Sequence, residues 1–181
     1  MGNPDGETDG NMPDVDADTP RCCESGGIPC FAPSHAAANI EGSKAFAKRF
    51  MTKHKIPTAK GVGFKYYSEA REYIKSIGYR VVIKASALAA GKGVIIPATK
   101  EEALAALDDI MVYKKFGDAA GASVVVEVYL EGDEISVHTF CDGYIFKSLP
   151  PGQDDKKAWV NGPNTGGMGV YTPTDFVLTM T

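Results

Sequence analysis

The most informative part of the chain reads Val81-Val82-Ile83-Lys84-Ala85-Ser86-Ala87-Leu88-Ala89-Ala90-Gly91-Lys92-Gly93-Val94-Ile95-Ile96. It begins and ends with apolar, β-branched residues, a pattern that predicts two adjacent antiparallel strands. Small residues between them let the backbone come close to a ligand, and Lys84 and Lys92 supply cationic donors. A loop of this composition can close over phosphate groups. Taken alone, the segment is equally compatible with an ordinary β-hairpin that has a flexible tip.

Two common glycine-rich phosphate motifs do not fit this segment. A P-loop requires a glycine at the position of Ser86 and a hydroxyl residue at the position of Gly93. A dinucleotide-binding fingerprint requires a third glycine where Ile96 stands, and a helix where the sequence predicts a strand. The spacing therefore excludes both motifs.

A second segment, residues 153–171, combines glycines with polar donors and is expected to form a long loop. Its glycines can expose consecutive backbone N–H groups, which suits the binding of anions. Lys156 and Asn164 add side-chain donors. A disordered linker is the alternative, but apolar residues such as Met168 and Tyr171 are uncommon in flexible linkers.

Taken together, these segments resemble the ATP-grasp region of phosphoribosylamine-glycine ligase, also called glycinamide ribonucleotide synthetase. The resemblance runs from about residue 27 to residue 174 and is closest to fungal enzymes, in which this ligase is fused to a second purine-pathway enzyme. It rests on five ordered motifs: residues 43–51, the Ile56-Pro57-Thr58 turn, residues 84–94, residues 127–134 and residues 153–171.

The resemblance implies a mixed α+β fold of the ATP-grasp type. Residues 28–181 would form a partial ATP-grasp domain, mainly the small nucleotide-gripping lobe (roughly 56–128) with part of the larger lobe. Residues 1–27 are acidic, lack an apolar segment typical of a signal peptide, and are expected to form a disordered leader.

The resemblance also implies roles for individual residues. Lys44 and Lys84 would contact nucleotide phosphates, and the loop of residues 87–93 would act as a lid over them. Glu134 would accept the ribose hydroxyls, and Lys156 and Asn164 would act in the substrate loop near the γ-phosphate. The lid contributes Ala90, Gly91, Lys92 and Gly93, and the backbone that would hold the adenine edge is that of Glu127, Val128, Tyr129 and Leu130.

The implied reaction is ATP-dependent joining of glycine to 5-phosphoribosylamine through glycyl phosphate, giving glycinamide ribonucleotide for purine synthesis. A substrate amine is the nucleophile, so catalysis would rest on positioning and charge neutralisation. Magnesium is an expected cofactor beside ATP. The family's downstream magnesium-binding Glu and Asn have no counterpart in this sequence, so the metal ligands are expected in a missing C-terminal part, and the missing ligase segments are expected as partners.

Two alternatives to an active ligase portion stay open. One is a catalytically inactive ATP-binding fragment, which lacks the metal site and the substrate domain. The other is a structural or misassembled chain, which would expose apolar sheet surface.

Composition agrees with a cytoplasmic protein that binds small molecules. The net charge of −4 argues against nucleic acid as a partner, and no apolar run reaches the length of a membrane span. The four cysteines are expected to be free thiols, because a zinc site formed by Cys22, Cys23, Cys30 and His35 would lack the usual ligand spacing.

Hydrophobic periodicity and turn residues predict the order of the elements. Phe46, Ala47, Phe50 and Met51 recur at helical spacing, and Thr99 with Glu102 forms a capping box at the start of another helix. We expect helices over residues 43–54, 68–77 and 99–116, and strands over residues 62–67, 80–84, 94–98, 123–128, 135–140 and 144–149.

Overall fold

The computed structural model describes residues 25–87, 89, 93–157, 162 and 164–174 of the 181-residue chain. The chain divides into two compact units, the first ending at Tyr129 and the second beginning at Leu130. The predicted acidic leader lies almost entirely outside the described residues.

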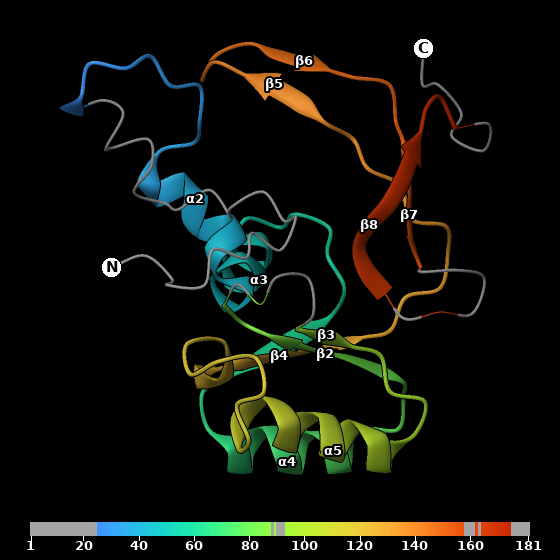
Figure 1. Cartoon of the computed structure of the whole chain (residues 1–181). Coiled ribbons are helices and arrows are strands. Elements are labelled where there is room, and N and C mark those ends of the chain that lie inside the picture. Colours follow the sequence, from blue (N-terminus) through green and yellow to red (C-terminus); the bar gives the residue numbers. More distant parts are fainter. Residues whose placement is uncertain (1–24, 88, 90–92, 158–161, 163, 175–181) are drawn as a thin grey trace, which may run out of the picture. The chain divides into compact units, whose positions relative to one another are not determined.

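The first unit is built around a four-stranded antiparallel sheet with the strand order β1-β4-β2-β3 (Figure 1). Strands β2 and β3 flank the small-residue loop and pair antiparallel, as the sequence predicts. Strand β3 is shorter than expected; Pro97, which has no N–H to donate to a strand ladder, follows it closely. The strands are β1 (Gly61–Phe64), β2 (Val81–Ala85), β3 (Val94–Ile95) and β4 (Val124–Val128).

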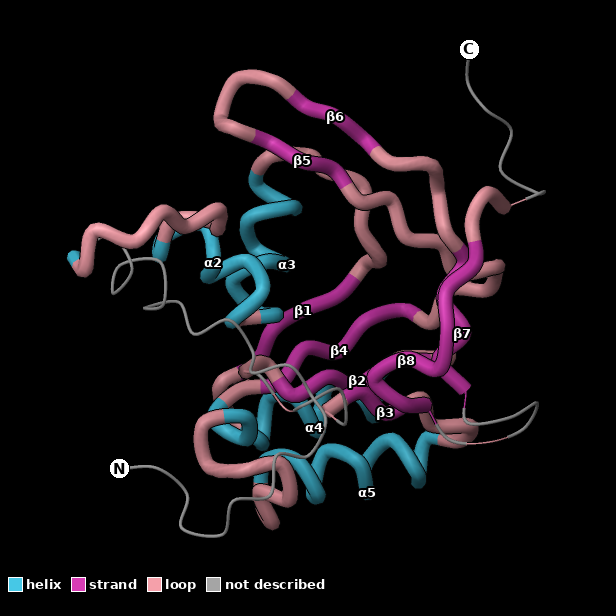
Figure 2. Tube along the Cα trace, turned by 45° about the horizontal axis from the view of Figure 1, so that its top comes forward, coloured by secondary structure: helices cyan, strands magenta, loops and turns pink. Residues whose placement is uncertain are grey.

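Helices lie on both sides of this sheet (Figures 1 and 2). On one side, α4 (Tyr67–Ser76) and α5 (Lys100–Met111) enclose the hydrophobic core, and a short 3-10 helix (Ala120–Ala122) precedes β4. On the other side, α3 (Lys44–Lys53) contacts β1 and β4, and α2 (His35–Gly42) precedes it. The fully buried larger side chains of the unit are Ile74, Ile83, Leu107, Ile110, Val124, Val125 and Val126.

Local signals explain where the helices begin. The Ser43 Oγ accepts the N–H of Phe46 at 3.3 Å at the start of α3, and the Thr99 Oγ1 accepts that of Glu102 at 3.1 Å at the start of α5. The Glu102 carboxylate completes the predicted capping box one residue further back, because it accepts the N–H of Ala98 at 2.8 Å. The sequence reading missed α2 (His35–Gly42).

The helix predicted over residues 43–54 is present as α3, but only one of the four apolar residues that predict it is buried. Phe46, Phe50 and Met51 are only half-buried, whereas Ala45, Ala47 and Lys48 are buried. The aromatic rings of Phe46 and Phe50 stack on each other, with centroids 6.1 Å apart. The helix therefore packs its small residues and one lysine against the sheet, because small side chains allow the closest approach of helix and strands.

The second unit consists of two antiparallel strand pairs. The predicted hairpin is present as β5 (Thr139–Cys141) and β6 (Phe146–Ser148) across the Asp142-Gly143 turn. The Asp142 Oδ1 accepts the N–H groups of Tyr144 and Ile145, at 2.9 and 2.8 Å, and Gly143 has the positive φ that such a turn requires. Large apolar side chains are exposed around it, including Phe140, Tyr144, Ile145 and Phe146.

The other pair corrects the expected long loop of residues 153–171. Most of that segment forms two strands, β7 (Gln153–Lys157) and β8 (Asn164–Tyr171), with Asp154 opposite Val170 and Asp155 opposite Gly169. Glycine content indicated a loop, but glycine weakens a strand only modestly. The pairing of β7 with β8, the next strand along the chain, then supplies the backbone hydrogen bonds.

None of the helices in the described part of the chain has the length and apolar character needed to cross a bilayer. Of the four cysteines, Cys30 and Cys141 are described, and both are exposed and not joined in a disulfide. Cys22 and Cys23, which the zinc alternative requires, lie outside the described residues.

Candidate functional site

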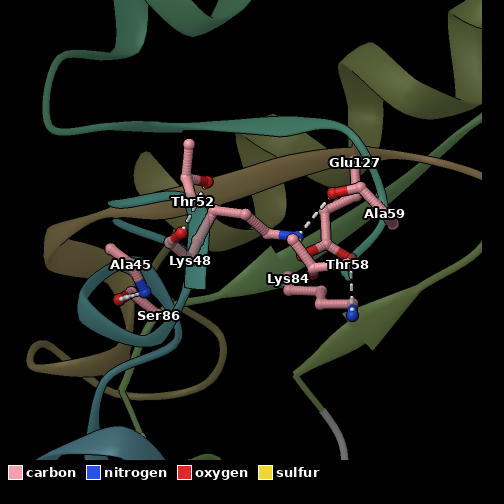
Figure 3. A network of polar contacts seen from close by, with 8 residues as sticks. All are labelled: Ala45, Lys48, Thr52, Thr58, Ala59, Lys84, Ser86 and Glu127. Atoms are coloured by element: carbon pink, nitrogen blue, oxygen red, sulfur yellow. Dashed lines mark hydrogen bonds and ion pairs between the residues drawn. The ribbon is translucent and has the colours of Figure 1, made fainter. Parts of the chain in front are cut away.

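The most unusual feature of the first unit is a buried carboxylate held between two lysines. Glu127 is 8 % exposed. Its Oε1 lies 2.9 Å from the Lys48 Nζ, and its Oε2 lies 2.7 Å from the Lys84 Nζ (Figure 3). We call these three residues the lysine–glutamate cluster.

The register of the sheet brings two members of the cluster together. In the β2–β4 pair, Val82 lies opposite Glu127 and Lys84 lies opposite Val125. Directly opposed residues share a face of the sheet, and alternate residues of one strand also share a face. Lys84 and Glu127 are therefore diagonal neighbours on the face that α3 approaches, while Val126 points into the core between α4 and α5.

A glycine on β1 makes room for the buried carboxylate. Gly61 lies opposite Glu127 in the β1–β4 pair. A Cβ atom at Gly61 would lie 2.7 Å from the Glu127 Cγ and 2.7 Å from the Val126 carbonyl oxygen, far inside van der Waals contact. A side chain at Gly61 would therefore displace either Glu127 or the strand.

Lys48 extends from α3 towards Glu127, and each N–H group of its ammonium has an acceptor. Besides Glu127, its Nζ donates to the Thr58 Oγ1 at 2.7 Å and to the Ala59 carbonyl at 2.6 Å. An ammonium group has three N–H donors, so these three contacts satisfy it. Lys48 is only 4 % exposed, and its charge is not presented to solvent.

Lys84 is the accessible member of the cluster. Its side chain is 30 % exposed, against 5 % for Lys48 and 10 % for Glu127. Burial alone would raise the pKa of the Glu127 carboxyl, but the hydrogen bonds and positive charges of Lys48 and Lys84 outweigh burial and lower that pKa. With the carboxylate ionised, two ammonium groups and one carboxylate carry a net charge of +1, which is presented at Lys84.

Ser86 ties the start of the small-residue loop to the start of α3. Its carbonyl accepts the backbone N–H of Lys44 at 2.8 Å, and its Oγ accepts that of Ala45 at 3.0 Å. The Lys44 Nζ donates to the Ala87 carbonyl at 3.3 Å. These bonds connect the start of α3, which carries Lys44, to the end of β2, which carries Lys84. Lys44 therefore borders the loop directly after β2.

The predicted lid is only partly described, since Ala90, Gly91 and Lys92 lie outside the described residues. Gly93 is described, and its carbonyl accepts the N–H of Ala85 at 2.8 Å. A Cβ atom at Gly93 would lie 2.6 Å from the Cβ of Ala89 and 3.1 Å from that of Ala85. The chain needs a glycine here to return against the end of β2.

The segment predicted to hold an adenine edge forms the end of β4 and the residues after it. The N–H of Val128 donates to the Lys60 carbonyl at 2.8 Å, and that of Tyr129 donates to the Arg80 carbonyl at 3.0 Å. Those two N–H groups are thus occupied, so a base would have to use other groups of the segment. Leu130 is exposed and begins the second unit.

Besides Leu130, three predicted site residues belong to the second unit. Glu134 is exposed and lies before the first hairpin. Lys156 lies on β7 and Asn164 begins β8, opposite Lys157 in the register. The lysine–glutamate cluster belongs to the first unit, so these residues lie in a different unit from it. Their predicted roles stay predictions.

The sequence reading did not assign a role to Lys48, Gly61 or Ser86. Lys48 follows Lys44 by one helical turn, so the spacing could have suggested that both lysines approach one site. Three other features depend on tertiary packing and have no local signal. They are the burial of Lys48, the pairing of Gly61 opposite Glu127, and the hydrogen bonds that Ser86 accepts from Lys44 and Ala45.

Comparison with known proteins supports the resemblance read from the sequence. Residues 42–180 match the family model described as the phosphoribosylglycinamide synthetase, ATP-grasp (A) domain. The chain belongs to this family. The match covers more than half of the chain, and it confirms both the predicted family and the predicted ATP-grasp fold.

Individual relatives agree. The chain is 55 % identical over 150 residues to the bifunctional purine biosynthetic protein ADE1 of Schizosaccharomyces pombe, covering 82 % of this chain and 19 % of that protein. It is 49 % identical over 149 residues to phosphoribosylamine–glycine ligase of Halalkalibacterium halodurans, covering 81 % of this chain and 35 % of that protein. The expected similarity to fungal bifunctional proteins is confirmed.

A solved structure gives the same result. The crystal structure of phosphoribosylamine–glycine ligase from Thermotoga maritima matches with a TM-score of 0.72 and 37 % identity, covering 81 % of this chain and 38 % of that one. The chain spans about a fifth of the length of the fungal relative and little more than a third of the bacterial ones.

Proposed function

We propose that this chain provides the ATP-gripping part of a phosphoribosylamine–glycine ligase. The observation that carries the proposal is the lysine–glutamate cluster, which presents a net positive charge at Lys84 beside the small-residue loop in a member of the ATP-grasp family. A triphosphate needs cationic partners placed in advance of binding, and Lys84 is the accessible cation of a buried cluster.

In this proposal the residues of the first unit hold the nucleotide. Lys84 and Lys44 contact its phosphates from two sides of the loop that begins at Ser86, and residues 87–93 exclude water from the reacting group. The backbone at the end of β4, from Glu127 onward, lies against the adenine. In the second unit, Glu134 accepts the ribose hydroxyls.

The proposed reaction joins glycine to 5-phosphoribosylamine in de novo purine synthesis, in the cytoplasm. ATP activates the glycine carboxylate as an acyl phosphate, which the substrate amine then attacks. Lys156 and Asn164 are proposed to contact substrate near the γ-phosphate. No protein nucleophile is required, so positioning and charge neutralisation account for the contribution of these residues.

The family also implies magnesium, which compensates phosphate charge when it is bound. Among the described residues, no group of three or more His, Cys, Asp or Glu side chains could hold a metal ion. We propose that the magnesium ligands belong to other segments of the ligase, which would be the natural partners of this chain.

Calorimetric titration with ATP, with and without magnesium, tests the proposal on the purified chain. We expect wild type to bind ATP, and we expect Lys84→Ala to weaken binding by about tenfold or more, because a charge-assisted phosphate contact contributes on the order of 1.5–3 kcal/mol. Lys53→Ala is the matched control, because Lys53 is an exposed lysine at the end of α3.

Two results would count against the proposal. Folded wild type that binds no ATP would mean that family membership reflects ancestry without nucleotide binding. Equal affinities of Lys84→Ala and Lys53→Ala would show that Lys84 does not contact phosphate.

A further inference from the structure

Lys48 has no role in the proposed chemistry, although it is among the most buried charged groups of the described residues. It lies in the first unit, where the Glu127 carboxylate contacts both Lys48 and the accessible Lys84 (Figure 3). Each carboxylate oxygen of Glu127 has its own lysine, Lys48 at 2.9 Å and Lys84 at 2.7 Å. The question is what a second, solvent-excluded cation contributes.

When Lys84 turns towards a phosphate, the Glu127 carboxylate loses one of its two counter-ions. A buried carboxylate that loses its counter-ion is strongly unfavourable. If Lys84 were the sole partner of Glu127, phosphate and carboxylate would compete for one ammonium group. With Lys48 in place, Glu127 keeps a counter-ion whichever way Lys84 points.

The geometry of Lys48 suits that task. Its ammonium is fixed by Thr58 and Ala59 as well as by Glu127, and its 4 % exposure prevents it from reaching a ligand. Gly61 leaves the space in which the carboxylate can lie against it. Lys48 is therefore a permanent partner of Glu127, whereas Lys84, with 30 % of its side chain exposed, is an exchangeable one.

We propose that Lys48 is a positioning residue for nucleotide binding, which neutralises Glu127 and thereby leaves the charge of Lys84 available to the ligand's phosphates. This inference rests on the proposed function. It differs from a purely mechanical role, in which Lys48 would simply connect α3 to residues 58–59 and to β4. A mechanical role would affect every ligand alike, whereas the proposed role concerns phosphate alone.

The experiment compares ATP with adenosine, which lacks phosphates, by calorimetric titration of the full chain in EDTA. Lys48→Met removes the buried charge and keeps an unbranched side chain. We expect it to weaken ATP binding by about tenfold and to leave adenosine affinity within about twofold, because Lys84 is then retained by Glu127. The control is Lys53→Met, which removes the same charge from the exposed end of α3 and should change neither affinity appreciably.

A double variant, Lys48→Met with Glu127→Gln, tests whether the effect of Lys48 on ATP binding acts through the carboxylate. It removes both the carboxylate and its permanent partner, so Lys84 should again be available and the ratio of ATP to adenosine affinity should return to within about threefold of wild type. Replacing both members of a buried ion pair is often tolerated where removing one is not. The double variant therefore serves as the test even if Lys48→Met fails to fold.

The outcomes distinguish this inference from the proposed function. Wild type that binds no ATP overturns both. Wild type that binds ATP, together with a Lys48→Met variant whose ATP and adenosine affinities fall in parallel or not at all, overturns the inference alone. A double variant whose affinity ratio stays well below that of wild type also overturns it.

Discussion

Replacing Gly61 with alanine is expected to destabilise the first unit, although alanine is normally the better strand residue. The added Cβ would lie 2.7 Å from the Glu127 Cγ and 2.7 Å from the Val126 carbonyl oxygen. The second of these atoms is backbone in the central part of the sheet, so it cannot move aside by a change of rotamer. The strand must shift, and the carboxylate must move relative to its two lysines.

The magnitude follows from two opposing terms. Overpacking a well-packed site costs about 1–3 kcal/mol, and replacing glycine by alanine returns roughly 0.5–1 kcal/mol through the unfolded chain. We therefore expect a net loss of up to about 2.5 kcal/mol, centred on about 1 kcal/mol, in the free energy of unfolding. Gly61 has no positive φ, so the loss would come from lack of space and not from backbone strain.

Gly63→Ala is the matched control for this prediction. Gly63 is on the same strand and the same face, but a Cβ there would lie 3.4 Å from the Cβ of Ala45, which is ordinary contact. This variant should be neutral or more stable than wild type by up to about 0.5 kcal/mol.

Urea unfolding followed by far-ultraviolet circular dichroism gives the midpoints and slopes for both variants. We expect the midpoint of Gly61→Ala to lie below that of wild type, and the midpoint of Gly63→Ala to lie at or above it. If Gly61→Ala unfolds at the same urea concentration as Gly63→Ala, or at a higher one, the close approach of Gly61 to Glu127 is not a feature of the folded protein.

Two further predictions concern acid and the core. The pKa of Glu127 is lowered from its ordinary value of 4.5, so its contribution to stability is present above about pH 4.5 and is lost as the pH falls through the lower folded value. In urea unfolding from pH 6 to pH 3, the double variant Lys48→Met with Glu127→Gln should therefore lose less unfolding free energy than wild type, and equal losses would contradict this. Leu107→Ala should lower the free energy of unfolding by about 2–5 kcal/mol in the same assay, because Leu107 is fully buried between α5 and the sheet. Leu104→Ala, at a half-buried position of the same helix, should cost less, and an equal cost would show that the assigned buried face of α5 is wrong.

The elements that the sequence predicts well are those with local signals. The helix that starts at Thr99 has its cap in the sequence, and the Asp142-Gly143 turn has a side chain that bonds its own backbone. The strands on either side of the small-residue loop are recognisable because β-branched residues lie on both sides of it. In each case the energetic preference acts over a few residues, so it can be read without knowing the fold.

The features that the sequence did not predict depend on partners outside the segment concerned. The glycines of β8 favour a loop when they are taken alone, and this segment becomes a strand by pairing with β7. The packing of α3 places Lys48 inside, where Glu127, Thr58 and Ala59 compensate its charge. A lysine normally avoids burial, and no local pattern marks the one that has its acceptors in place.

The two glycines of β1 connect these observations. At Gly63 the absence of a side chain lets α3 approach closely through Ala45, whose N–H bonds to Ser86. At Gly61 it leaves the space for the carboxylate that holds both lysines. At Gly61 a side chain would displace Glu127 or the strand, whereas Gly63 accommodates an alanine and only a larger side chain there would push α3 away from β1. The position of the carboxylate that holds Lys48 and Lys84 therefore depends on a residue that has no chemistry of its own, so stability and nucleotide affinity should respond together at Gly61 but separately at Lys84.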